Sequence, residues 1–365
     1  MQIDFYYRTF GELKVNKDLG FDDPEGIMAS LNNRMREALL CNPSGYTDDE
    51  TCQILALYEK RVVGCINAFM TRVSINNKVH LVQTGSYLYA SEKYRKENVG
   101  GELFFRLTNL HPQKKNYYAG ISQMAQPIYK VLKYKLFEFP RLIYLRKSKS
   151  IVHALLKTES NWCLPVILMA DCLLWVHRII IVLLNSPRHL KYQVVQSALV
   201  SKDIERISLN DHHPFMEVHD KAWLQWNLNH TFSTDNRNKK RLYEIKKGNA
   251  TEAFFIIKQE FFEQASSRGF KNVYLGSVVE WGIDASSKLQ ERDLYLMALS
   301  CFDKCVDGVQ VATSDMNTVR SLKRNMFVRI GDATMAFKMK SVKDEGMDDI
   351  NNWRVRIAGG DTLLD

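Results

Sequence analysis

The stretch that most constrains this chain is 87–107, an apolar, aromatic run that passes through a basic turn into a second apolar run. After the pair Gly100-Gly101, Leu103 and Leu107 recur at helical spacing. The pattern predicts a strand that leads through a turn into a helix. The first N–H groups of a helix have no partner within it, and the helix dipole adds partial positive charge there. Such a turn suits a phosphate or pyrophosphate, although an ordinary solvated turn shows the same local pattern.

Length and charge narrow the class of protein. A chain of 365 residues is long enough for two domains, and its 45% hydrophobic and 25% charged residues are typical of a folded globular protein. The formal net charge is +9, which could serve nucleic acid, an anionic lipid surface or a polyanionic small ligand. The basic residues are dispersed and form no single stripe, which disfavours a nucleic-acid groove binder.

The cysteines and the N-terminus indicate the compartment. The seven cysteines form no C-x-x-C pair and their number is odd, which favours free thiols in a reducing compartment over a disulfide framework or a zinc site. We therefore expect no metal. The opening residues, MQIDFYYRTF, lack a basic segment followed by an apolar one, so they do not indicate a signal peptide. We expect a cytoplasmic protein.

The first half of the sequence reads as a mixed α/β layer. In chain order we expect a helix over 24–40, a hairpin of strands 52–58 and 62–73, a strand over 79–89, the glycine turn, a helix over 101–111, a strand over 116–121, a short helix over 126–134 and a strand over 136–145. Residues 146–160 are polar and basic and read as a linker.

Residues 162–184 are the most hydrophobic stretch, and their length would allow a membrane span. Asp171, His177 and Arg178 in its middle argue against a span, because charges at bilayer depth are costly. We expect a buried helix between two domains. A membrane-surface helix is the intermediate alternative.

The second half repeats this element order without repeating the residues. We expect a helix over 219–228, a hairpin of strands 241–247 and 252–261, a strand over 272–281, a helix over 286–303, a strand over 309–313, a helix over 317–324 and a closing hairpin over 326–340 that turns at Gly331-Asp332. The expected domains are 1–150 and 193–365, joined by a linker, 151–192, that carries the apolar helix. The fold class is α/β, with a mixed α+β sheet in each domain.

The opening stretch resembles motif A of the GNAT (Gcn5-related N-acetyltransferase) superfamily, R/Q-x-x-G-x-G/A, which here would run from Arg95 to Gly100. Asn98 replaces the first glycine, and asparagine adopts the left-handed conformation more readily than most residues. A second resemblance lies downstream, where Tyr129-Lys-Val-Leu-Lys-Tyr134 has the shape of the family's Y-x-x-L-G-F. Lys133 departs from the family's glycine.

The resemblance implies tandem GNAT-like domains, the second of them degenerate. The strand over 272–281 is followed by Gly-Ile-Asp-Ala-Ser-Ser, without the motif, and Leu322 stands where the late tyrosine would be. We therefore expect one acyl-CoA site, in the first half.

The resemblance also implies an N-acyltransferase that moves an acyl group directly from acyl-CoA, either acetyl-CoA or a hydroxyacyl-CoA, to a primary amine. The glycine turn would bind the CoA pyrophosphate, and the preceding strand would pair with pantetheine and offer an N–H at Leu88 or Tyr89 to the thioester carbonyl. The expected CoA-binding residues are Leu88, Tyr89, Ala90, Arg95, Lys96, Asn98, Val99, Gly100 and Gly101. Tyr129 would protonate the leaving thiolate. Glu280 is the candidate base, with His212 and His213 as alternatives.

The degenerate domain would bind the acceptor, and Trp223, Trp226 and Trp281 would offer rings to stack on a sugar or nucleotide. A double-GNAT chain of this size with an aromatic-rich second half resembles bacterial N-acyltransferases that act on nucleotide-linked amino sugars in surface polysaccharide biosynthesis. An aminoacyl-tRNA-dependent peptidyl transferase of cell-wall synthesis is a second possibility. The third is a non-enzymatic protein that binds nucleic acid or a membrane surface; for the enzyme we expect no nucleic-acid partner and at most weak membrane-surface contact.

Overall fold

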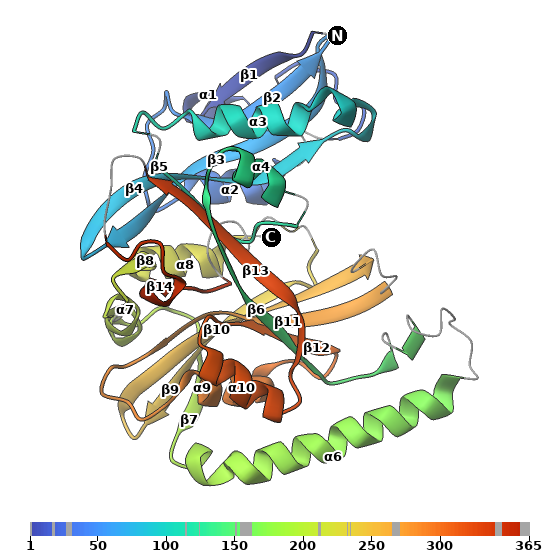
Figure 1. Cartoon of the computed structure of the whole chain (residues 1–365), viewed down its shortest axis with the longest axis vertical. Coiled ribbons are helices and arrows are strands. Elements are labelled where there is room, and N and C mark those ends of the chain that lie inside the picture. The colour runs from blue at the N-terminus through green and yellow to red at the C-terminus, as the bar shows by residue number, and fades with distance from the viewer. Residues whose placement is uncertain are drawn as a thin grey trace. The chain divides into compact units, whose positions relative to one another are not determined.

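The structure is a computed structural model (Figure 1). It describes residues 2–16, 19–26, 31–113, 115–123, 125–149, 152–153, 163–210, 213–231, 233, 235–264, 271–339 and 345–357. The chain forms two compact units. Unit 1 comprises Met1–Glu138, His212–Thr234 and Thr334–Asp365, and unit 2 comprises Phe139–Asp211 and Asp235–Ala333.

Unit 1 is built on a mixed sheet. Its first four strands pair antiparallel in chain order, the fifth lies parallel to the fourth, and the sixth lies antiparallel to the fifth: β1 (Asp4–Thr9), β2 (Thr51–Tyr58), β3 (Arg61–Ile75), β4 (Lys78–Ala90), β5 (Lys115–Tyr118) and β13 (Val328–Met339). Two short strands, β8 (Phe215–Glu217) and β14 (Trp353–Arg354), extend from β3. The unit's helices are α1 (Phe10–Val15), α2 (Asn33–Leu40), α3 (Val99–Thr108), α4 (Gln126–Val131) and α8 (Lys221–Asn229).

Helix α3 covers one face of this sheet, and two glycines set how closely it packs. A Cβ at Gly64 in β3 would crowd Leu103 and Val99, and a Cβ at Gly85 in β4 would overlap Leu107. The apolar face of α3 meets the strands there and forms the core of unit 1. The close approach fixes the start of α3 beside the end of β4.

Unit 2 has the same pairing pattern. Its strands lie in the order β7 (Gln193–Ser197), β9 (Lys239–Lys247), β10 (Ala250–Gln264), β11 (Lys271–Ile283), β12 (Gly308–Ala312) and β6 (Lys135–Leu145). Only the β11–β12 pair is parallel; the other pairs are antiparallel. Its helices are α6 (Leu164–His189), α7 (Lys202–Leu209), α9 (Glu291–Ala298) and α10 (Met316–Arg324), and buried residues of α9, α10 and the strands form its core.

Each sheet is completed by a strand from the other half of the sequence. Residues 141–145 of β6 pair with β12 in unit 2, and residues 336–339 of β13 pair with β5 in unit 1. The contacts therefore divide the chain differently from the expected consecutive domains, since 334–365 and 212–234 gather with the first half. The closing hairpin at Gly331-Asp332 was wrong, because β13 runs straight through this pair.

The apolar stretch forms one helix, α6, as expected, but it is not buried. Only 6% of its apolar window, Leu164–Ile181, is buried, and this window is long and apolar enough to cross a membrane. The expectation of a buried helix between domains was therefore wrong. Trp162, which began the expected helix, lies outside the described residues.

Candidate functional site

A β-bulge interrupts β4 just before the strand ends. In the β3–β4 pairing Cys65 faces Tyr89 and Asn67 faces Ser86, so two residues of β4 lie opposite the single residue Ile66. Tyr87, within the bulge, has a φ of 53°, which is rare for a residue other than glycine. A bulge takes a residue out of the hydrogen-bonded ladder and re-aims its amide. The bulge therefore changes the direction of the Leu88 amide relative to the β3–β4 ladder.

A pocket opens beside this bulge. In the described part of the structure β4 pairs with β5 at Gln83–Asn116, although β4 continues to Ala90. Past that pair the two strands diverge. The space has a volume of about 340 Å³ and is lined by β4, α3, the end of β5 and α4, among others by Ser86, Leu88, Phe104, Tyr118 and Tyr129. All of its lining residues belong to unit 1.

Tyr129, the proton donor that the resemblance implies, lines this pocket. It is buried in α4 and packs against three aromatic rings. The ring centroids of Phe104, Tyr118 and Tyr134 are 4.5, 5.4 and 5.3 Å from that of Tyr129. Burial raises the pKa of Tyr118 and of Tyr134 above the usual tyrosine value. Burial in this aromatic cluster therefore keeps the phenols of Tyr118 and Tyr134 protonated.

The start of α3 has the geometry of an anion site. Asn98 is the N-cap, with φ 55° and ψ 30°, so the left-handed conformation expected at this position is confirmed. Its side chain makes no capping hydrogen bond to the helix. A Cβ at Gly101 would collide with the Asn98 side chain, whereas one at Gly100 would meet only the Ala90 Cβ at 3.7 Å. Gly101 is required by local packing, and Gly100 leaves space above the first turn.

The cations of the turn precede α3 in a 3₁₀ segment, Glu92–Glu97. Lys96 is exposed there. The Arg95 side chain lies outside the described part of the structure. The turn therefore places Lys96 next to the unpaired N–H groups of the α3 N-terminus.

Sequence reasoning missed a row of polar residues at the pocket. Ser86 lines the pocket, is almost fully buried, and its Oγ has no hydrogen-bond partner within the described structure. Asn67 lies directly across from Ser86, and Gln53 lies across from Asn67, with 3.2 Å between Gln53 Nε2 and Asn67 Oδ1. The signal was present in the sequence, because polar residues at matched positions of three buried strands are unusual.

Glu25 was missed as well. Its carboxylate accepts hydrogen bonds from Tyr89 Oη at 3.3 Å and from Ser91 Oγ at 2.7 Å. These contacts tie the segment before α2 to the end of β4. No short motif marks Glu25, because its partners are more than sixty residues away in the sequence.

The tryptophans expected to bind the acceptor have packing roles. Trp223 and Trp226 lie in α8 of unit 1 and are buried. Trp223 stacks on His219, with 3.5 Å between ring centroids, and Trp226 Nε1 donates to the carbonyl of Ala38 at 2.9 Å. Internal packing therefore explains both residues.

The remaining candidates are dispersed. Trp281 lies in β11 of unit 2 and packs at 6.3 Å against the Tyr295 ring. Glu280, the preceding residue, is fully buried and accepts from the Trp281 backbone N–H at 3.1 Å. His213 is half-buried in unit 1, and His212 lies outside the described residues. None of these lines the pocket beside the β4 bulge. No group of three or more metal-ligating side chains occurs among the described residues.

In unit 2 the side chains at the corresponding place, the start of α9 beside the end of β12, bond to one another. Glu291, at the start of α9, accepts from Tyr295 Oη at 2.7 Å and from Thr313 Oγ1 at 3.0 Å. Tyr295 Oη also lies 3.1 Å from the Ala312 carbonyl, which it contacts across the end of β12. The N-terminus of α9 carries a capping box, Gln290 with Asp293. The start of α9 is thus capped by its own side chains.

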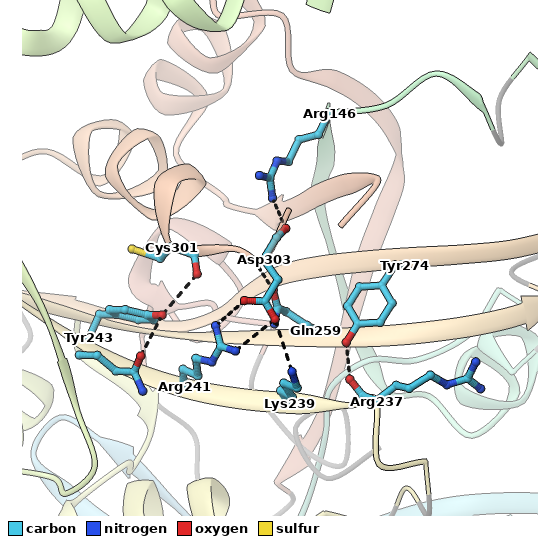
Figure 2. Close-up of polar contacts among 10 residues, drawn as sticks. Arg146, Arg237, Lys239, Arg241, Tyr243, Gln259, Tyr274, Cys301 and Asp303 are labelled. Atoms are coloured by element: carbon cyan, nitrogen blue, oxygen red, sulfur yellow. Dashed lines mark hydrogen bonds and ion pairs between the residues drawn. The ribbon is translucent and has the colours of Figure 1, made fainter. Parts of the chain in front are cut away.

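A carboxylate hub fixes the connection after α9 (Figure 2). Asp303 accepts from both terminal nitrogens of Arg241, at 2.8 and 3.1 Å, and pairs with Lys239 at 3.5 Å. The Gln259 side chain accepts from the backbone N–H of Asp303 and donates to its carboxylate, and Arg146 donates to the backbone carbonyl of Asp303 at 2.9 Å. The hydrogen bond from Arg241 lowers the pKa of Asp303. The hub is saturated by internal contacts, which indicates a structural clamp.

Comparison with solved structures identifies the fold. A Gcn5-related N-acetyltransferase from Anabaena variabilis matches 93% of this chain and 73% of its own, with a TM-score of 0.53 and 10% sequence identity. Saccharomyces cerevisiae N-myristoyltransferase, solved with bound myristoyl-CoA and inhibitors, matches 92% of this chain and 80% of its own, with a TM-score of 0.56 and 12% identity. Searches of family models and of curated proteins give no match.

These similarities and the repeated strand pattern show the same architecture. The chain has the GNAT fold, in tandem, within a mixed α/β class, as the motifs predicted.

Proposed function

We propose that this chain is an acyl-CoA-dependent N-acyltransferase whose acyl-CoA site lies in unit 1. The observation that carries the proposal is the uncapped start of α3 beside the bulged end of β4 and the pocket between β4 and β5. An acyl-CoA has an anionic pyrophosphate, an extended amide-containing arm and a thioester. The helix start suits the pyrophosphate, the pocket between β4 and β5 suits the arm, and the bulged end of β4 suits the thioester.

The chain has polar groups that suit the pyrophosphate and the pantetheine arm of acyl-CoA. The pyrophosphate would accept from the N–H groups of Val99, Gly100 and Gly101, with Lys96 beside it and Arg95 as the second cation proposed from the sequence. The pantetheine amides would pair with the backbone of β4 over 88–90, where the strand has diverged from β5. A volume of about 340 Å³ accommodates such an arm.

Acyl-CoA supplies an activated acyl group, and the chain supplies the polar groups around it. The amide of Leu88, re-aimed by the bulge, would donate to the thioester oxygen as negative charge develops. The acceptor nitrogen forms a bond to the acyl carbon while the carbon–sulfur bond breaks. Tyr129 would give its proton to the sulfur, and the proton of the amine leaves to a base.

Glu280 is our sequence-based proposal for that base. It is an ionisable residue near the end of β11 in unit 2. A Glu280→Gln variant tests it through the pH profile of kcat/KM. The acidic limb should be lost if Glu280 takes the proton, and an unchanged profile would remove it from the mechanism.

We further propose that the acceptor is the amino group of a nucleotide-linked amino sugar, in surface polysaccharide biosynthesis. The net charge of +9 supports a polyanionic acceptor beside a polyanionic donor. All seven cysteines are free thiols, which supports a cytoplasmic location, where such nucleotide sugars would be available. An acceptor panel that compares amino-sugar nucleotides with free amino sugars and peptide amines tests this step.

Thermal unfolding with CoA tests the site itself. A ligand that binds only the native state raises the melting temperature, by an amount equivalent to about 2.7 kcal/mol at a hundredfold excess over Kd. We expect a concentration-dependent rise with CoA. An unmoved melting temperature at saturating CoA would overturn the proposal, whatever the acceptor.

A further inference from the structure

Helix α6 contacts unit 2 along one stripe, and most of its other described side chains are apolar and exposed. One stripe faces unit 2: Ile181 is buried in the core of that unit, and Ile167 is buried against Val152 and Cys163. Asp171, on the same stripe, accepts from the backbone N–H of Ser148 at 2.7 Å. The Ser148 hydroxyl bonds to the Ile167 carbonyl at 3.2 Å. These contacts attach α6 lengthwise to unit 2.

The opposite face of α6 is apolar and open to solvent. The most exposed residues, at 59–66% exposure, are Leu168, Met169, Leu173, Trp175 and Leu183. Soluble proteins rarely expose a contiguous apolar surface of this extent without a partner. Figure 1 shows α6 as the long helix in light green.

The charges around this face are positive. Lys149, Arg178 and Lys191 are exposed before, within and after the helix. Asp171 is the one acidic residue of 163–191 in the sequence, and its carboxylate is bonded to Ser148. A second copy of the chain would bring the same cations against one another with no acidic partner. An anionic lipid surface offers both the apolar layer and the complementary charge.

We propose that the outer face of α6 docks the protein onto an anionic membrane, with the helix lying in the plane of the lipid headgroups. A spanning orientation would need α6 to leave unit 2, because Ile167 and Ile181 hold both of its ends against that unit. Trp175 sits among the apolar residues where an interfacial aromatic is favoured.

Vesicle co-sedimentation with the full chain tests the proposal. We expect binding to vesicles that mix phosphatidylcholine with phosphatidylglycerol, weaker binding to phosphatidylcholine alone, and weakening by salt. The double variant Leu173→Gln/Trp175→Gln should bind at least about tenfold more weakly. The matched control, Val15→Gln/Val79→Gln, also replaces two exposed apolar residues, on α1 and β4, and should bind like the wild type.

Trp175 also reports the depth of the helix. Its contribution is the difference between the fluorescence of the wild type and that of Trp175→Phe. Because Trp175 lies near the middle of α6, a spanning helix would place it at the bilayer centre. We expect stronger quenching by lipids brominated near the headgroup than by lipids brominated at the chain ends.

Three results would overturn the proposal. The first is no binding to anionic vesicles, or equal loss of binding in the control variant. The second is a dimer in analytical ultracentrifugation that Leu173→Gln/Trp175→Gln dissociates without any vesicle binding, which would identify a second copy as the occupant. The third is strongest quenching from the chain ends, which would indicate a membrane span.

Discussion

The start of α3 in unit 1 and the start of α9 in unit 2 occupy the same place in the same pattern of strands. Each follows a strand with a bulge, at Tyr87 in β4 and at Val279 in β11, and the bulge precedes the helix by the same number of residues. The parallel strand comes next in both units. Backbone geometry alone therefore does not distinguish a ligand site from a structural turn.

The side chains in the first turns of α3 and α9 differ. The first turn of α3 has Asn98 without a capping bond, then Gly100-Gly101, and its one carboxylate, Glu102, pairs with Arg106 at 2.9 Å. The first turn of α9 carries two carboxylates, Glu291 and Asp293. Carboxylates at a helix N-terminus stabilise the helix and repel a phosphate. The contrast supports a single acyl-CoA site, in unit 1.

The largest expected effect is the difference between Tyr129, at the pocket of unit 1, and Tyr295, at the corresponding place in unit 2. Tyr129→Phe should lower kcat by about 10²–10⁴-fold with CoA affinity retained, because a general acid contributes about that much. Tyr295→Phe in unit 2 should leave turnover unchanged and lower the free energy of unfolding by about 1 kcal/mol through its lost hydrogen bonds. Steady-state kinetics and CoA titration measure both. Wild-type turnover in Tyr129→Phe would remove that residue from the mechanism.

The next effect comes from making the start of α3 resemble that of α9. Gly100→Asp should weaken CoA binding by roughly 100-fold, because a carboxylate about 4 Å from phosphate costs several kcal/mol even where partly screened. The same change should stabilise the free protein by about 0.3–1 kcal/mol through the helix dipole.

Gly100→Ala is the matched control, since its Cβ meets only Ala90 at an ordinary distance. It should stabilise the free protein by about 0.5–1 kcal/mol and keep most of the CoA-induced rise in melting temperature. If Gly100→Asp bound CoA like Gly100→Ala, the phosphates would lie elsewhere.

Much of this site could be predicted from local sequence. The strand, turn and helix around Gly100-Gly101 are confirmed, because period-two and helical patterns there agree with the fold. The backbone conformation of Asn98 and the place of Tyr129 on a short helix could be predicted because each depends on local sequence.

What sequence could not give depends on pairing between distant strands. Strand β6 pairs with β12 of unit 2, and β13 pairs with β5 of unit 1. No local sequence signal specifies which sheet edge each of these strands joins. Trp223 and Trp226 looked like ligand-stacking residues because composition does not reveal burial. Helix α6 was expected to be a core helix because its charged residues argued against a membrane span, whereas Asp171 marks the face that meets the protein.

A third prediction concerns the side chains at the start of α9 in unit 2. Thr313→Val removes the part-buried hydrogen bond from Thr313 Oγ1 to Glu291, and such a bond contributes about 0.5–1.5 kcal/mol. We expect that loss in the free energy of chemical denaturation, with turnover unchanged. A large loss of turnover at wild-type stability would mean that unit 2 takes part in the chemistry through these side chains.

The smallest expected effect is the pH dependence of the Asp303 hub in unit 2. Because Arg241 lowers the pKa of Asp303 in the folded protein, the unfolded chain binds the proton more readily. The contribution to stability is therefore present above the unfolded pKa of about 4 and is lost as pH falls through the lower, folded value. Asp303→Asn should cost about 1 kcal/mol at neutral pH, a partly exposed ion pair being worth little more, and the variant and wild type should converge in stability in acid. A difference that stays constant down to the acid transition would show that Asp303 stabilises unit 2 through geometry and not through its charge.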